Sequence, residues 1–232
     1  IIGPMNGGMN FPVGFSFLES KMEKFIYTPM RLLSHIVNLI LPGKLFAAVL
    51  LVANKRTEDA LPKFTTGQRM LLVENAVDLD SWKQSTLIDD KKTINFIFIG
   101  RLADWKCCDL LLKAFQTIYQ KYPAKLRIVG DGEDMESLQH LASSMVTEQV
   151  VSFTGWLTPT DTHKVLSESD VLVLPSVREC GGAVVLEAMS LSKPVIAVNW
   201  GGPADYITPE TGIMVEPENS EQLVRDLSDA MV

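Results

Sequence analysis

The sequence has little cysteine and little histidine, the residues that most often build disulfide frameworks and zinc sites. Its 232 residues include three cysteines, of which Cys107 and Cys108 are adjacent and Cys180 lies far along the chain. The number is odd and no Cys-x-x-Cys pair is present, so neither a disulfide framework nor a zinc site is expected. We therefore predict that the protein needs no metal and that its setting is reducing and cytoplasmic.

Positive charge is also scarce, and it is unevenly distributed. The chain has 21 Lys and Arg against 28 Asp and Glu, a net charge of −7. Residues 1–76 hold eight basic against five acidic residues, whereas residues 77–232 hold thirteen against twenty-three. An acidic main body argues against nucleic-acid binding, which needs many cations to neutralise phosphates. The difference in charge predicts two separate units.

The chain lacks an uninterrupted apolar run that is long enough to cross a bilayer. Its most apolar region, residues 32–53, contains Pro42, Gly43 and Lys44 in the middle, whereas a spanning helix needs about 20 consecutive apolar residues. We expect a helix followed by a buried strand there. Because residues 1–76 are basic and rich in apolar helix, peripheral contact with a membrane stays open as an alternative.

From residue 94 onward, short apolar strands alternate with helices of roughly ten residues. Runs such as INFIFIG and DVLVLP are rich in β-branched and other apolar residues, and DLLLKAFQTIYQKY between them has helical spacing. This alternation predicts α/β architecture, a doubly wound parallel sheet buried on both faces. Ligands bind such sheets at the carboxyl ends of the strands. The loops expected at those ends carry glycine or charge: GRLADWK, GDGED, TGWLTP, SVRECGG and NWGGPADY.

We predict three parts along the chain. Residues 77–93 are polar and aperiodic, which is typical of a linker. Residues 1–76 contain the strand and short helix of LLVANKRTEDALPKF and the strand RMLLVEN, the end of a second α/β domain that is incomplete. Residues 94–232 form the main domain. The chain starts without Met and ends within an expected helix, and we interpret it as a piece of a longer protein.

The segment RECGGAVVLEAM, residues 178–189, places two acids around a pair of glycines. The helix after Gly182 is apolar on every side, which predicts that it is buried. An ionised Glu187 within it would need a partner. The diol of a sugar ring offers two donors to it, although an exposed helix edge is an alternative. Gly181 and Gly182 allow close approach of a ligand and open a helix whose first N–H groups suit phosphate or sugar oxygens. A simple turn is the other interpretation of the two glycines.

The loop GRLADWK supplies two cations at the same edge of the sheet. Arg101 directly follows the first strand of the main domain, and Lys106 opens the next helix. A guanidinium and an ammonium that converge there suit a diphosphate leaving group, on which negative charge builds. Two surface cations after a strand are common, so the loop alone does not decide the function.

Together these segments resemble the retaining glycosyltransferases of family 4, which have the GT-B fold and a donor domain known as glycosyl transferases group 1. The resemblance rests on FIGRLADWKCCDLLLKAF, LRIVGDGEDMESL, VSFTGWL and SDVLVLPSVRECGGAVVLEAMSLSKPVIAVNWGGPADYI, and it covers nearly all of residues 70–232. The family's motif of two glutamates separated by seven residues is intact at Glu179 and Glu187. The chain departs from the family pattern at Ala76, in a motif that usually reads Asn-Gly-Val-Asp, and at Cys107.

Cys107 stands where the family usually has glycine, directly after the loop lysine. We expect its side chain to crowd the phosphate pocket. A thiol at a helix start beside Lys106 is also expected to have a lowered pKa.

The resemblance implies a role for each candidate site residue. Arg101 and Lys106 would hold the donor diphosphate, and Glu187 would hold the ribose hydroxyls. Glu179 would be the catalytic residue, in contact with the transferred sugar near its reacting carbon. The remaining donor contacts implied by the resemblance, to sugar, phosphate or base, involve Gly100, Gly130, Gly132, Trp156, Gly181, Gly182, Ala183 and Val184.

The same resemblance implies that a hexose is transferred from a nucleotide-sugar donor to a saccharide or lipid-linked acceptor. Transfer would retain the anomeric configuration and need neither metal nor other cofactor. We expect the fragment alone to be inactive, because most of the acceptor domain is absent from it.

Other functions are weighed against the same residues. A nicotinamide dehydrogenase is excluded, because GDGEDM at residues 130–135 lacks the third glycine of the dinucleotide fingerprint. A sugar-nucleotide epimerase of the same fold usually works with histidines and carboxylates in the cleft. The chain has only three histidines, His35, His140 and His163, and the epimerase stays a second alternative. A nucleotide-sugar binding module without transferase activity stays open as the alternative from another class.

Overall fold

The computed structural model describes the following residues of the chain: 1–73, 75–77, 93–145 and 150–232. The contacts among them separate two units. One consists of Ile1–Phe11 and Ser16–Ala76, and the other of Pro12–Phe15 and Val77–Val232. Most of the predicted linker, residues 77–93, lies outside the described residues.

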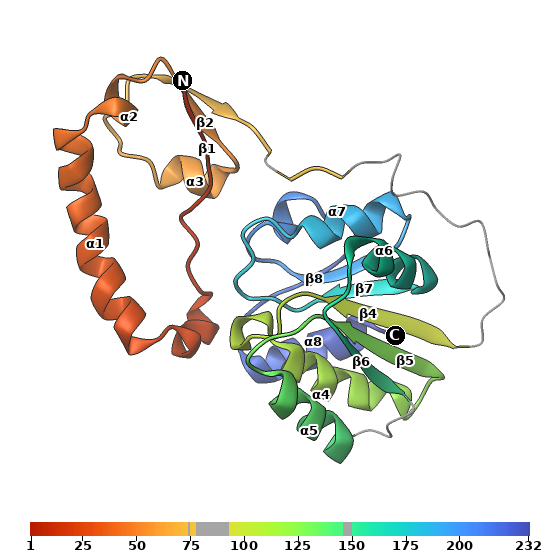
Figure 1. Ribbon diagram of the computed structural model, residues 1–232. Coiled ribbons are helices and arrows are strands. Elements are labelled where there is room, and N and C mark those ends of the chain that lie inside the picture. The colour runs from red at the N-terminus through yellow and green to blue at the C-terminus, as the bar shows by residue number, and fades with distance from the viewer. Residues whose placement is uncertain (74, 78–92, 146–149) are drawn as a thin grey trace. The chain divides into compact units, whose positions relative to one another are not determined.

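The first unit contains a small parallel sheet (Figure 1). Its strands follow the order β1-β2-β3 and are β1 (Ile2–Met5), β2 (Val49–Val52) and β3 (Gln68–Leu71). The helices of this part of the chain are η1 (Val13–Leu18), α1 (Lys21–Ile40), α2 (Gly43–Phe46) and α3 (Lys55–Asp59). Leu50 and Val52 of β2 form its small core with Leu61.

The apolar region of residues 32–53 forms a helix and a strand, as the sequence predicts. Helix α1 ends at Ile40, the short α2 follows directly after Pro42, and β2 begins at Val49. Among the described residues, no helix combines the length and the apolar character needed to cross a bilayer.

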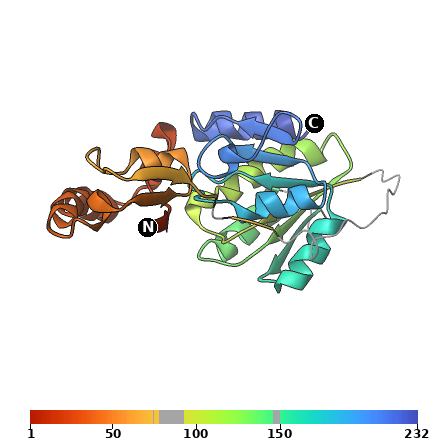
Figure 2. The same cartoon turned by 90° about the horizontal axis from the view of Figure 1, so that it is seen from above.

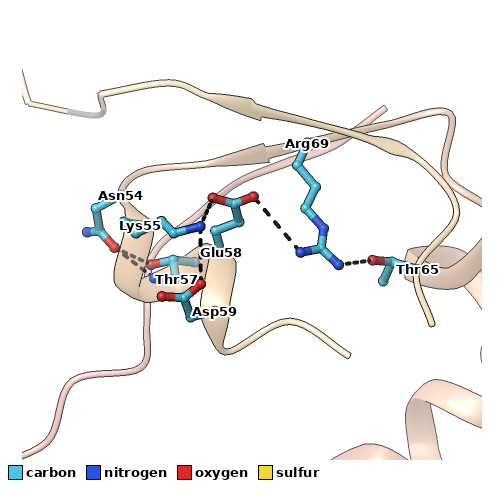
Figure 3. Close-up of polar contacts among 7 residues, drawn as sticks. All are labelled: Asn54, Lys55, Thr57, Glu58, Asp59, Thr65 and Arg69. Atoms are coloured by element: carbon cyan, nitrogen blue, oxygen red, sulfur yellow. Dashed lines mark hydrogen bonds and ion pairs between the residues drawn. The ribbon is translucent and has the colours of Figure 1, made fainter. Parts of the chain in front are cut away.

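Side-chain contacts hold α3 against the sheet of the first unit (Figure 3). Asn54 caps the helix, because its side-chain oxygen accepts a hydrogen bond from the backbone N–H of Thr57 at 2.9 Å. Arg69 of β3 lies 3.9 Å from Glu58 of α3 and donates to the hydroxyl of Thr65 at 3.0 Å. These contacts join elements that the sequence predicts separately as a short helix and a strand.

The second unit is built on a parallel sheet with helices on both faces. Its strands follow the order β6-β5-β4-β7-β8-β9 and are β4 (Ile94–Ile99), β5 (Ala124–Val129), β6 (Val151–Gly155), β7 (Val171–Leu174), β8 (Val195–Val198) and β9 (Gly212–Val215). One face carries α4 (Cys108–Tyr119), α5 (Met135–Met145) and α8 (Ser220–Ala230), and the other carries α6 (Pro159–Glu168) and α7 (Ala183–Ser190). The views of Figure 1 and Figure 2 agree on these layers. The predicted doubly wound α/β sheet is confirmed.

The core of this unit lies between the sheet and its helices. All four residues of β8 are buried, as expected of a strand that is covered on both faces. Helix α4 packs against α5 and α8, and its Phe115 meets Phe96 of β4 edge to face at 6.3 Å between ring centroids. The apolar residues that mark the strands in the sequence therefore also position β4 at the centre of the sheet.

Helix α7 is less buried than its apolar sequence predicts. It buries Val185 and Ala188, whereas Ala183 in its first turn is exposed. The expectation of a helix buried on every side is wrong, because α7 packs on the sheet with one face only. Its first turn stays accessible at the carboxyl edge of the sheet.

The strand order reverses between β4 and β7. The chain runs outward from β4 through β5 to β6 and then returns to pair β7 with the other side of β4. Loops that leave neighbouring strands in opposite directions open a crevice at the carboxyl ends, where ligands bind in sheets of this kind. The loops after β4 and β7 therefore flank the place where a site is expected.

Candidate active site

Lys106 and Glu179 meet at the reversal of strand order. Lys106 ends η2 (Asp104–Lys106), directly after β4, and Glu179 lies in the loop between β7 and α7. The Nζ atom of Lys106 donates to Oε2 of Glu179 in an ion pair. The two side chains are 14% and 16% exposed. An ammonium and a carboxylate that are 73 residues apart in the chain thus share one largely buried position.

Backbone hydrogen bonds hold the loops that carry this pair. The N–H of Val177 donates to the carbonyl of Trp105 at 3.0 Å, which joins the loop after β7 to the loop after β4. The N–H of Gly202 donates to the carbonyl of Glu179 at 2.8 Å and ties in the loop after β8. The positions of both side chains are therefore fixed at their backbones.

Two predicted glycines lie directly at the ion pair. A Cβ atom on Gly100 would lie 3.9 Å from Nζ of Lys106, and one on Gly182 would lie 3.3 Å from Cγ of Glu179. Gly182 is left-handed, with φ +65°, and immediately precedes α7. The pair therefore lies between the end of β4 and the first turn of α7, whose leading N–H groups have no partner within the helix.

The loop between β7 and α7 also packs against the loop after β8. A Cβ atom on Gly202 would lie 2.5 Å from the carbonyl oxygen of Gly181. Residue 202 must therefore be a glycine for the two loops to approach so closely. Ala183 and Val184 begin α7 directly after Gly182, so their backbone N–H groups belong to the first turn of that helix.

Arg101 lies in an adjoining pocket and not in the ion pair. This pocket of about 440 Å³ opens at the ends of β4, β5 and β6 and is lined in part by Gly100, Arg101, Gly130, Asp131, Trp156 and Thr162. The Nε atom of Arg101 donates to Glu133 at 3.1 Å, with both side chains exposed. Trp156 is 70% exposed and presents its indole there. Gly100 lines the pocket and also approaches Lys106, so the pocket and the ion pair adjoin.

Gly130 and Gly132 allow the loops after β4 and β5 to touch. Gly130 has φ +132°, and a Cβ atom on it would lie 1.8 Å from the carbonyl oxygen of Gly100. One on Gly132 would lie 2.2 Å from the carbonyl oxygen of Leu102. The N–H of Leu102 donates to the carbonyl of Asp131 at 2.9 Å between these contacts. The resemblance implies that these glycines border the base, which stays a prediction. In the structure they pack the two loops together.

Glu187 lies on α7 and is half-buried. Within the part of the chain that the structure describes, its carboxylate has no hydrogen-bond or ion-pair partner. Burial raises the pKa of this carboxyl group above its usual range. The group is therefore poised to accept donors from a ligand.

Cys107 differs from what the sequence predicts. Its thiol is buried, and burial raises its pKa, with the charge of Asp109 adding to the effect. The expectation of a lowered pKa is wrong, because desolvation outweighs the lowering effects of the Val177 backbone and of Lys113. The residue has φ +52°, in the left-handed region, which explains physically why glycine suits this position.

Sequence reasoning missed Glu133 and Gly202. Glu133 pairs with Arg101 across 32 residues, and Gly202 anchors the carbonyl of Glu179. Both follow strands at the carboxyl edge, in the segments GDGED and NWGGPADY. Their place in those loops was visible in the sequence, whereas their partners depend on which strands are neighbours.

Known proteins share the segment that builds this site. Residues 78–231 match the sequence model of the family described as glycosyl transferases group 1. The match covers well over half of the chain.

The chain belongs to the glycosyl transferases group 1 family.

Two relatives and one solved structure illustrate the similarity. An uncharacterized glycosyltransferase of Methanocaldococcus jannaschii is 36% identical over 146 residues, which cover 61% of this chain and 37% of that protein. The GDP-mannose-dependent monoacylated alpha-(1-6)-phosphatidylinositol monomannoside mannosyltransferase of Corynebacterium glutamicum is 35% identical over 132 residues, 53% of this chain and 34% of that protein. The structure of Anabaena HepE in complex with UDP and glucose has a TM-score of 0.63 at 20% identity, covering 82% of this chain and 55% of that one.

The chain therefore spans little more than a third of the length of these two relatives. Its predicted membership of the group 1 glycosyl transferases is confirmed, and the similarity to HepE supports the same fold. Assignment to family 4 and retention of configuration stay predictions.

Proposed function

We propose that this group 1 glycosyl transferase domain binds a nucleotide-sugar donor. In the whole protein, the hexose of the donor would pass to a saccharide or lipid-linked acceptor with retention of the anomeric configuration. The observation that carries the proposal is the meeting of Lys106 and Glu179 at the reversal of strand order. A cation, an acid and the start of a helix adjoin at the place where sheets of this kind bind nucleotides.

Lys106 and the first turn of α7 are suited to the donor diphosphate. Negative charge builds on the diphosphate as the bond to the sugar breaks, and a positioned ammonium stabilises it. The free N–H groups at Ala183 and Val184 add the positive end of the helix dipole. Arg101, in the adjoining pocket, supplies a second cation. These groups neutralise the leaving group, so we propose that no metal or other cofactor is required.

The pocket beside Arg101 is suited to the base of the donor. Trp156 offers an exposed aromatic face for stacking, and Gly100 and Gly130 line the same pocket. Glu187 would accept hydrogen bonds from the two ribose hydroxyls, whose donors match its two carboxylate oxygens. Its half-buried and unpartnered carboxylate, within the described residues, supports this role.

Glu179 is proposed as the catalytic residue. Its carboxylate beside the first turn of α7 would stabilise the positive charge that develops on the sugar ring as the leaving group departs. The acceptor hydroxyl would attack from the face that the diphosphate leaves, and a phosphate oxygen would take its proton. Retention of the anomeric configuration follows from attack on that face.

The name of one relative bears on the acceptor. The Corynebacterium relative is named for a phosphatidylinositol mannoside, which supports a lipid-linked acceptor as well as a saccharide. We propose a cytoplasmic protein that contacts the membrane surface peripherally.

A calorimetric titration of the full chain with UDP-, GDP- and ADP-sugars tests the proposal. We expect the sugars of one nucleotide to bind with clearly higher affinity than those of the other two. Binding of NAD in their place, or of no nucleotide, would contradict the proposed function. Transfer itself is tested in the whole protein by following the anomeric proton of the product by NMR, and an inverted product would exclude the retaining mechanism. Donor binding without any transfer by the whole protein would favour a binding module.

A further inference from the structure

We propose that Glu179 has a second role, in which it holds Lys106 in an ion pair before the donor binds and competes with the diphosphate for this lysine. The proposal rests on the donor function given above. Glu179 then acts as a positioning residue through Lys106, in addition to its contact with the sugar. Each catalytic cycle would exchange the carboxylate for the diphosphate and then reverse the exchange.

The competition follows from the charges at this position. Lys106 offers one ammonium, and it already donates to Oε2 of Glu179. The two side chains are only 14% and 16% exposed, so neither charge is well solvated without the other. A diphosphate that approaches the ammonium brings further negative charge next to the carboxylate, and like charges repel strongly where water is excluded. The carboxylate must therefore release the lysine when the diphosphate binds.

The surroundings allow this exchange to take place in the side chains alone. The hydrogen bonds from Val177 to Trp105 and from Gly202 to Glu179 fix the backbones of both loops. The side chains themselves lie beside glycines, because Gly100 adjoins the ammonium and Gly182 adjoins the stem of the acid. At Gly182 a Cβ atom would lie 3.3 Å from Cγ of Glu179, so glycine keeps space beside the acid while the loops stay in place.

The exchange has a consequence for product release. After transfer, the nucleoside diphosphate remains beside Lys106 with no sugar for Glu179 to contact. The carboxylate then returns to the lysine and weakens the hold on the product. Release of product often limits turnover in enzymes, so an internal competitor would speed this step.

Replacing the acid with its neutral isostere tests the idea. The probes are UDP, GDP and ADP, and the one that binds the unaltered chain most tightly is used for all variants. We expect Glu179→Gln to lower the dissociation constant of this nucleoside diphosphate 3- to 10-fold, the larger value corresponding to about 1.4 kcal/mol. The probe carries no sugar, so a residue that only contacts the sugar would leave its affinity unchanged. Unchanged or weaker binding overturns the inference.

A double-mutant cycle separates the ion pair from a general effect of charge. Lys106→Met is expected to weaken binding of the probe. Adding Glu179→Gln to it should bring a smaller gain than in the unaltered chain, because only the repulsion between carboxylate and diphosphate is then removed. An equal gain in both backgrounds would show that the ion pair plays no part, which overturns the inference. Thermal unfolding verifies that each variant is folded. If Glu179→Gln is not, Glu179→Asp keeps the charge but shortens the reach, and it should tighten binding to a smaller degree.

The outcomes also separate this inference from the proposed function. Suppose that the probe binds the unaltered chain, that Lys106→Met weakens this binding, and that the Glu179 variants bind the probe no more tightly. The donor function then stands and the proposed competition is wrong. If no nucleoside diphosphate binds the unaltered chain, the proposed function fails and the inference fails with it.

Discussion

Two residues of this domain have a burial or a backbone conformation that their residue type alone does not reveal. Glu187 is half-buried, and Cys107 is buried in a left-handed conformation. Burial raises the pKa of both side chains, because it disfavours the charged form of an acid and of a thiol alike. Both states have consequences that can be measured.

Glu187→Gln should raise the thermal stability of the chain at pH 7 but not at pH 4. The native pKa of Glu187 is raised, so the native state holds this proton more firmly than the unfolded state. The stability that this group contributes is therefore complete below the unfolded pKa of about 4.3 and is lost as the pH rises through the native pKa. Glutamine does not titrate, and we expect a gain of roughly 2 °C at pH 7.

Calorimetric melting curves at the two pH values measure this effect. The pH dependence separates it from a change in packing, which would shift the melting temperature equally at both values. An equal shift would contradict the assigned cause.

Cys107→Gly should be more stable than Cys107→Ala by about 1 kcal/mol. Both variants lose the buried thiol, so the difference isolates the strain of a Cβ atom at φ +52°. Cys108 is the matched control, because it is equally buried but begins helix α4. At position 108 the alanine variant should be more stable than the glycine variant, by up to about 1 kcal/mol. Denaturant unfolding of the four variants measures both differences, and the same sign at both positions would exclude the explanation.

Elements of the domain are joined at the carboxyl edge through their loops. The loops after β4 and β5 touch at Gly130 and Gly132, and the loops after β4 and β7 are joined by the hydrogen bond from Val177 to Trp105. The site thus consists of loops that support one another. A change at one contact between loops should therefore affect the pocket and the ion pair together.

Gly130→Ala should destabilise the chain by about 3 kcal/mol and weaken nucleotide binding. A Cβ atom there would lie 1.8 Å from the carbonyl of Gly100, so the two loops must move apart. Gly155 is the matched control, since its φ is also positive, +71°, but no atom lies within 4 Å of a Cβ on it. Gly155→Ala should cost only the conformational strain, about 1 kcal/mol. Equal losses in denaturant unfolding would show that strain alone matters and that the contact does not.

The whole domain brings one cation and one acid together where the strand order reverses. Lys106 and Glu179 come from strands that are neighbours in the sheet although they lie far apart in sequence. The proposed neutralisation of the diphosphate by Lys106, Arg101 and a helix start leaves no role for a divalent cation.

Excess EDTA should therefore leave nucleotide-sugar binding unchanged, and added Mg²⁺ should not strengthen it. The same titrations that identify the donor measure this, with the Lys106→Met variant as the control that must lose affinity. A loss of binding in EDTA that Mg²⁺ restores would contradict the proposed role of the cations.

Much of the architecture follows from local pattern. The expected strands and helices after residue 94 appear as β4 to β9 and α4 to α8, because burial between helix layers imposes the apolar spacing that the sequence displays. Strand β1 was not predicted, since Gly3 and Pro4 interrupt a run of only four residues. Helix α7 was predicted to be buried because composition does not reveal which faces of a helix find a neighbour.

The sequence by itself determined the alternation of strands and helices, the spacing of Glu179 and Glu187, and the glycines at the carboxyl edge. These features depend on residues close together in the chain, whose periodicity and conformational freedom act locally. Only the tertiary structure decided that Lys106 pairs with Glu179 and Arg101 with Glu133, across 73 and 32 residues. Such partners depend on the order of the strands, and that order is set by the packing of the whole sheet.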